Sequence, residues 1–186
     1  MSLDLITPPT EEPVSLAELK AHLRIAHDDD DAAITSYALA ARRAVEARAG
    51  IALIEQGWRL TLDRAPQGAM LLPRAPVFAI DAVQTVDRDG DTDAIDADLF
   101  DFEPGAPARF ISRGLWPYSD RLIAGVRIDF TAGWAGAEDV PEELRLAVQM
   151  LAAHFYENRE GAQPERVFAV PQAVDALLAP WRRVRL

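Results

Sequence analysis

Eight carboxylates lie between Asp87 and Glu103 and form the densest group of potential ligands or acid–base residues in the chain. The stretch 87–93, DRDGDTD, alternates oxygen ligands around a glycine, as the start of a calcium loop does. The EF-hand spacing fails, because Gly90 comes too early and no Glu stands at the twelfth position. Asp and Gly are also ordinary turn residues. We therefore expect a solvated hairpin tip. A metal-dependent hydrolase that uses these carboxylates with His154 stays as the alternative.

Other groups suited to catalysis are few and scattered. The histidines are His22, His27 and His154. His154 shares a helical face with Glu157 at i+3, but one such pair without partners falls short of a metal site. The chain has no Cys, and it contains no nucleophile elbow, phosphate-binding loop or dinucleotide fingerprint. The acidic run 28–31 is better explained as a helix start. We expect no catalytic residue, no metal, no cofactor and no enzymatic activity.

Charge divides the 186-residue chain unevenly. The formal net charge is −11, whereas residues 163–186 carry four Arg against Glu165 and Asp175, so residues 1–162 carry −13. A body of this charge repels a phosphate backbone, so we expect no direct binding of nucleic acid. No apolar run reaches the ~20 residues that span a bilayer, and the N-terminus lacks the pattern of a signal peptide. We expect a protein of the bacterial cytoplasm that does not enter a membrane.

Three helices are predicted to position these groups, at about 15–26, 29–49 and 141–160. Ser15 and Glu18 form a capping box, and apolar residues then recur at helical spacing. Gly50 is suited to end the second helix. Pro141 is suited to the first position of the third helix.

Between the second and third helices the hydrophobic period changes to that of strands. Residues 58–63 and 126–131 alternate between apolar and polar, 77–86 has strand composition, and Asp89-Gly90 is a good hairpin turn. We predict an antiparallel meander of five short strands in an insertion at about 57–132. The fold class is therefore α+β: a small helical bundle with an inserted antiparallel sheet. Residues 1–162 form the body and residues 163–186 form a C-terminal docking tail.

The tail, 163–186, is apolar and basic on an otherwise acidic chain. Pro171 and Pro180 frame one short helix, and Val174, Leu177 and Leu178 share a face of it. Such a segment cannot form a core by itself, so it folds back on its own body or docks on a partner. The charge contrast favours the partner. Trp134, in a loop bracketed by glycines, and Trp116, followed by Pro117-Tyr118, are either interface anchors or ordinary packing.

Several segments, in order along most of the chain, resemble the head–tail connector (adaptor) proteins of tailed bacteriophages. The resemblance is carried by Val14 to Arg24 with its acidic turn, by LPRAPV at 72–77 and by FTAGW at 130–134. It continues through VPEEL at 140–144, HFYENR at 154–159 and the closing motif from Val170-Pro171 to Arg182. It fits the longer subtype, in which a β-rich insertion separates the second and third helices. Related proteins occur in gene transfer agents.

The resemblance implies a structural adaptor that forms a ring of twelve copies beneath the portal protein and above a stopper or tail-completion protein. DNA passes through the lumen of such a ring without being read, and the neck of the particle is the expected location. The C-terminal segment of the family embraces the portal. An assembly factor absent from the finished particle is a further alternative. The portal-binding residues expected here are Val170, Pro171, Val174, Leu177, Leu178, Trp181, Arg182, Arg183 and Arg185.

Overall fold

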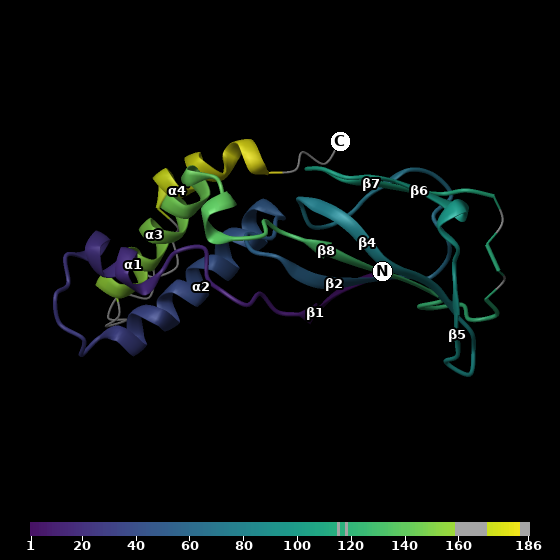
Figure 1. Cartoon of the computed structure of the whole chain (residues 1–186), viewed down its shortest axis with the longest axis horizontal. Coiled ribbons are helices and arrows are strands. Elements are labelled where there is room, and N and C mark those ends of the chain that lie inside the picture. The colour runs from purple at the N-terminus through teal and green to yellow at the C-terminus, as the bar shows by residue number, and fades with distance from the viewer. Residues whose placement is uncertain (115, 118, 159–170, 183–186) are drawn as a thin grey trace. The chain divides into compact units, whose positions relative to one another are not determined.

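The chain divides into two compact units in a computed structural model that describes residues 1–114, 116–117, 119–158 and 171–182 (Figure 1). The β unit comprises Met1–Thr10 and Glu55–Gly133, and the helical unit comprises Glu11–Ile54 and Trp134–Leu186. The chain is therefore α+β, and every described strand except β1 (Ser2–Thr7) lies between the second and third helices, as the sequence predicts.

The helical unit contains α1 (Leu16–Leu23), α2 (Asp31–Ala49), α3 (Glu142–Glu157) and α4 (Gln172–Leu178), with short 3-10 turns η2 (Ala137–Asp139) and η3 (Ala179–Trp181). The predicted capping box at Ser15 and Glu18 is confirmed. Hydrogen bonds from Ser15, and then Arg145, hold the pKa of Glu18 below its usual range. Gly50 ends α2 with φ 71°, the left-handed conformation that glycine adopts at no steric cost.

The boundaries of all three predicted helices of the body differ from the prediction. Helix α3 begins at Glu142, with Pro141 at its N-cap and not at its first position, and ends at Glu157. Helix α1 stops at Leu23, because Arg24 adopts φ 57° and its N–H turns back to the carbonyls of Ala21 and Lys20. Asp30 stands at the N-cap of α2 but makes no side-chain capping bond. Its neighbours Asp28 and Asp31 instead lie 2.5 and 2.7 Å from Lys20 Nζ. The acidic run thus serves mainly to bind α1 to the start of α2.

Apolar stripes from the four helices meet in one core. Leu19, Ile34, Leu144, Leu151 and Leu178 are each at most 1% exposed. Burial of a side chain of this size contributes roughly 1.5–3 kcal/mol, so the core accounts for the packing of α1, α2 and α4 with α3.

The β unit holds two antiparallel sheets. The larger has the order β1-β2-β8-β4-β5 and the smaller has the order β3-β7-β6, preceded by the 3-10 turn η1 (Ala97–Leu99). The strands are β1 (Ser2–Thr7), β2 (Gln56–Leu62), β3 (Met70–Leu71), β4 (Val77–Val86), β5 (Thr92–Ala94), β6 (Phe100–Glu103), β7 (Arg109–Ser112) and β8 (Val126–Ala132).

The predicted five-strand meander is wrong in topology. Strand β8 lies between β2 and β4 and pairs with both, so the last strand of the insertion is inserted between two strands that come earlier in the sequence. Alternation along a strand reveals its buried face but does not reveal its partner. Arg59 and Asp129, directly opposite on β2 and β8, form two side-chain hydrogen bonds of 2.7 Å. Strand β1, which was not predicted, adds an edge to the sheet.

The β unit has its own core, to which Leu60, Phe110, Ile128 and Phe130 contribute side chains that are fully buried. Polar residues alternate with them along β8, whose burial pattern matches a half-buried strand. Within the described residues, no helix is long and apolar enough to cross a membrane.

Candidate partner interface around the C-terminal helix

The tail forms the predicted short helix between two prolines. Pro171 stands at the N-cap of α4, and Pro180 follows in η3, so the helix has seven residues. Val174 and Leu178, at i and i+4, are both 0% exposed and pack in the helical unit, where α4 contacts α3 and α2. Both side chains are therefore buried within their own chain, whereas the charge contrast had favoured docking on a partner. In this conformation neither is available to another protein.

The other side of the tail is open. Pro171, Leu177 and Trp181 are partly exposed and Arg182 is exposed. The Trp181 ring meets the Trp134 ring edge-on, with centroids 5.8 Å apart at 77°. Trp134 therefore packs against the tail, which was one of the two roles expected for it. The Trp181 Nε1–H is buried without a hydrogen-bond partner among the described residues.

Asp175 is the electrostatic centre of α4. Its Oδ1 accepts hydrogen bonds from Arg48 Nε at 3.2 Å and from Arg182 Nη2 at 2.5 Å. Arg48 first and Arg182 second hold the pKa of this carboxyl below its ordinary value. Arg182, expected to meet an acidic partner, is thus engaged within its own chain. The sequence did not predict Arg48 as a member of this site, because Arg48 lies 127 residues before Asp175 and no local pattern indicates the contact.

Three of the expected portal-binding residues, Val170, Arg183 and Arg185, lie outside the described residues, as does Tyr118. Six residues of the expected set lie in the described part. Four of them, Pro171, Leu177, Trp181 and Arg182, are at least partly exposed, and Asp175 and Arg48 lie with them. The other two, Val174 and Leu178, are buried.

A buried ionic network lies on α2 in the helical unit. Arg42 and Glu46 are 5% and 6% exposed, and Arg42 donates to Glu46 at 2.9 Å and to Glu12 at 2.8 Å. Glu46 also accepts the backbone N–H of Leu53 at 2.9 Å. A buried carboxylate is tolerated only with such partners. The i, i+4 spacing of Arg42 and Glu46 was visible in the sequence, but their burial was not.

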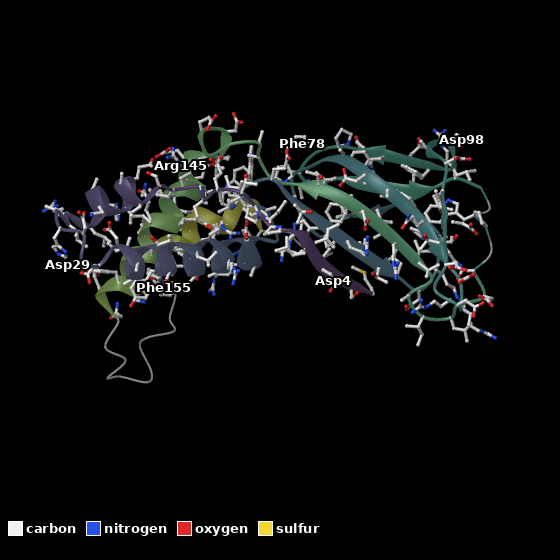
Figure 2. All side chains as sticks on the ribbon, turned by 60° about the horizontal axis from the view of Figure 1, so that its bottom comes forward. Asp4, Asp29, Phe78, Asp98, Arg145 and Phe155 are labelled. Carbon is white, nitrogen blue, oxygen red and sulfur yellow. The ribbon has the colours of Figure 1, made fainter. Side chains whose placement is uncertain are left out.

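The acidic segment 87–103 lies in the β unit and contains a hairpin turn. Asp87 Oδ1 accepts the backbone N–H groups of Gly90 and Asp91, at 2.8 and 2.9 Å, as in an ordinary Asx turn. Figure 2 places Asp98 at the surface of the same unit. In the part of the chain that the structure describes, no three His, Asp or Glu side chains converge as ligands for a metal.

His154 does not join those carboxylates, because it lies on α3 in the helical unit. Its Nδ1 is 3.2 Å from the side-chain nitrogen of Asn158, and its Nε2 is buried without a partner among the described residues. The ring is packed beside Phe155. This is the environment of a helix-packing histidine.

The chain is similar to chains in solved structures and matches a family model. Three solved structures contain a chain 35% identical in sequence, and each match covers 100% of this chain and 97% of the other. They are the neck of an empty gene transfer agent (GTA) particle computed with C6 symmetry, the virion of a native GTA particle, and the neck of a native GTA particle computed with C12 symmetry. Their TM-scores are 0.82, 0.83 and 0.82. The comparison with curated proteins finds no match.

An α+β body with a short C-terminal helix, shared over its whole length with neck proteins, defines the class of head–tail connectors, as the sequence resemblance predicted. The chain belongs to the head completion protein family, whose model matches residues 12–184. That match spans the helical unit and the β unit together, so the insertion is part of the family pattern.

Proposed function

We propose that this chain is the subunit of a head–tail connector ring that joins the capsid to the tail of a phage or of a phage-like gene transfer particle. Twelve copies form a ring beneath the portal protein, and a stopper or tail-completion protein docks below it. The protein assembles in the host cytoplasm and remains in the neck. It acts as a structural adaptor and performs no catalysis.

The observation that carries this proposal is the end-to-end likeness to chains of GTA necks, at 35% identity over 100% of this chain. The printed C6 and C12 symmetries of those necks support a ring, because repeated head-to-tail contacts close into a ring when the rotation closes. The family match over residues 12–184 supports a role in completing the head.

In this proposal one face of α4 is packed in the helical unit, and the exposed residues of the tail contact a partner. Val174 and Leu178 anchor α4 in the helical unit. Pro171, Leu177, Trp181 and Arg182 are left to contact the portal, together with Val170, Arg183 and Arg185 from the flanking segments. Arg182 exchanges Asp175 for an acidic group of the portal, since an exposed ion pair is readily replaced.

DNA passes through the ring without specific binding. The net charge of −11 supports this, because a conduit that repels phosphates does not hold the DNA in transit.

Incorporation into particles tests the portal contact. We expect the double variant Trp181→Ala/Arg182→Gln to keep its fold, because both anchors of α4 remain, and to be incorporated at least tenfold less than the wild type. Quantitative mass spectrometry of purified heads measures this. Arg43→Gln, which removes an exposed arginine of α2, is the matched control and should be incorporated normally. Equal incorporation of all three chains contradicts the portal-binding role of the tail.

Two measurements separate the alternatives. An assembly factor would be absent from finished particles, whereas a connector subunit is present in purified, tailed particles at a fixed number of copies. A metal-dependent hydrolase would gain thermal stability from its ion, because a ligand that binds only the folded state raises the melting temperature. We expect calcium, magnesium and zinc each to leave the melting temperature unchanged, and a clear rise would favour the hydrolase.

A further inference from the structure

The loop before β8 exposes two large apolar side chains side by side. Leu122 is 69% exposed and Ile123 is 74% exposed, more than any other large apolar residue described in the β unit except the terminal Met1. Phe78, which projects from β4 (Figure 2), is 59% exposed. An adjacent Leu and Ile at a loop tip are unlike the polar residues that ordinarily occupy turns.

Hydrogen bonds hold this tip in one conformation. Arg121 Nε donates to the carbonyl of Ile123 at 2.9 Å, and the N–H of Ala124 donates to Asp63 Oδ1 at 3.1 Å. Ala124 has φ 59°, a left-handed conformation that is unfavourable for a residue with a Cβ. Such a conformation persists only where surrounding contacts fix it, and it is typical of functional loops. A preorganised apolar tip loses little entropy on binding.

A hollow adjoins the tip. It has a volume of about 810 Å³ and is lined by Leu122 together with Pro66, Trp116 and the two arginines Arg64 and Arg121. The Trp116 indole donates to the carbonyl of Leu99 at 2.8 Å and meets the Phe110 ring edge-on, so its position is fixed. The tip and the hollow thus form one continuous surface of the β unit.

The charges at this surface are unbalanced. Within the described residues, neither Arg64 nor Arg121 has a carboxylate within ion-pair distance. Asp63, which also lines the hollow, accepts the backbone N–H of Ala124, and Asp120 accepts the backbone N–H of Arg88 and lies 3.8 Å from its Nε. The lining of the hollow therefore carries one net positive charge, from Arg64 and Arg121 against Asp63. Unpaired guanidinium groups beside an apolar hollow favour an occupant that carries carboxylates.

Symmetry argues against a ring contact in which the tip of one copy enters the hollow of the next copy. A ring contact joins two different patches of the subunit, whereas a patch that meets its own equivalent gives a two-fold dimer. Here Leu122 belongs to both the tip and the hollow, so both lie at the same place. The surface is formed where β2 and β4 end and β8 begins, at Leu62, Val86 and Val126. The chain crosses to the helical unit at the opposite ends of β2 and β8, beside Gln56 and Ala132.

We propose that the Leu122–Ile123 tip and the adjoining hollow are the docking end for a different protein of the neck, one that presents apolar side chains beside carboxylates. Leu122 and Ile123 enter an apolar recess of that protein, and its carboxylates meet Arg64 and Arg121. This inference rests on the proposed function, because it assigns the contact of the ring with a neck protein other than the portal.

Photo-crosslinking in assembled particles tests the identity of the occupant. Ile123 is replaced by p-benzoylphenylalanine in particles whose only copy of this chain is the variant, and the crosslinked species from purified particles are identified by mass spectrometry. We expect adducts with a different chain of the neck. The same replacement at Phe78 is the control and should give at least tenfold less of that adduct. Adducts with a second copy of this chain, or none, overturn the inference.

An acidic substitution tests the consequence. We expect Leu122→Asp/Ile123→Asp to be incorporated into heads like the wild type and to lower the fraction of tailed particles at least tenfold in electron micrographs. Phe78→Asp, also at an exposed apolar residue of the β unit, should leave that fraction unchanged. Normal tailing of the double variant overturns the docking end but leaves the connector role intact. Absence of even the wild-type chain from particles overturns the proposed function itself. The crosslink decides the matter if the double variant fails to fold.

Discussion

At the scale of single residues, the tail is governed by Asp175 and by two buried aliphatic side chains. Asp175 holds Arg48 and Arg182 at one oxygen, while Val174 and Leu178 fix the helix beneath it. The ionic contacts orient exposed groups, whereas the apolar contacts supply most of the stability, because exposed ion pairs are screened by water.

The pKa of Asp175 should therefore be measurably low. Because the folded-state pKa is depressed, the stabilising contribution is fully present above the ordinary Asp value of about 3.9. It is lost as the pH falls through the lower folded value. NMR titration of the carboxyl checks this, and Arg48→Gln should return the pKa toward normal by more than Arg182→Gln does. An ordinary pKa in the wild type would contradict the contact.

Leu178→Ala should lower the free energy of unfolding of the helical unit by about 2–4 kcal/mol, since a fully buried Leu is lost and a cavity remains. Urea denaturation followed by fluorescence of Trp134 and Trp181 measures the change. Leu177→Ala, at a partly exposed residue of the same helix, should cost clearly less. Similar losses for the two variants would mean that α4 does not pack as described.

At the scale of elements, local signals and long-range contacts cooperate at α1. Ser15 and Glu18 complete the capping box, and Arg145 of α3 donates to Glu18 and to the carbonyl of Pro13. Glu18, which completes the capping box of α1, is therefore also a residue through which α3 contacts α1.

Ser15→Ala should destabilise the helical unit by about 1 kcal/mol, because the N–H of Glu18 loses its acceptor and the carboxylate loses a donor. Chemical denaturation measures this. Ser36→Ala is the matched control, because its hydroxyl only returns to the carbonyl of Ala32 within α2. An equal cost for both would show that the cap contributes nothing.

At the scale of the whole molecule, the net negative charge disfavours binding to nucleic acid. A net charge of −11 is shared by both units, and the carboxylates of 87–103 gather in one segment of the β unit. In the proposed connector ring, this charge keeps DNA free to move and leaves partner recognition to a few apolar and basic groups.

The chain should not bind duplex DNA measurably at about 150 mM salt, because it releases no counterions on approach. Fluorescence anisotropy of a labelled 40-base-pair duplex checks this, with a basic DNA-binding protein as the positive control. Binding with a dissociation constant tighter than about 10⁻⁴ M, the weak limit of ordinary non-specific binding, would contradict the proposed passive conduit.

The sequence by itself determined the local structure: the capping box at Ser15, the stop at Gly50, the strands at 77–86 and 126–131 and the helix between Pro171 and Pro180. Each depends on side chains a few residues apart, so short-range patterns suffice. The resemblance of ordered motifs also gave the family correctly.

Only the tertiary structure decided what each element meets. It placed β8 between β2 and β4, turned Val174 and Leu178 inward, and joined Asp175 to Arg48 across 127 residues. It also held Leu122 and Ile123 outward by means of Asp63, from another strand end. The spacing of apolar residues predicts which side chains are buried, but it does not predict the surface against which they pack. That choice depends on contacts between distant segments, which exist only once the chain has folded.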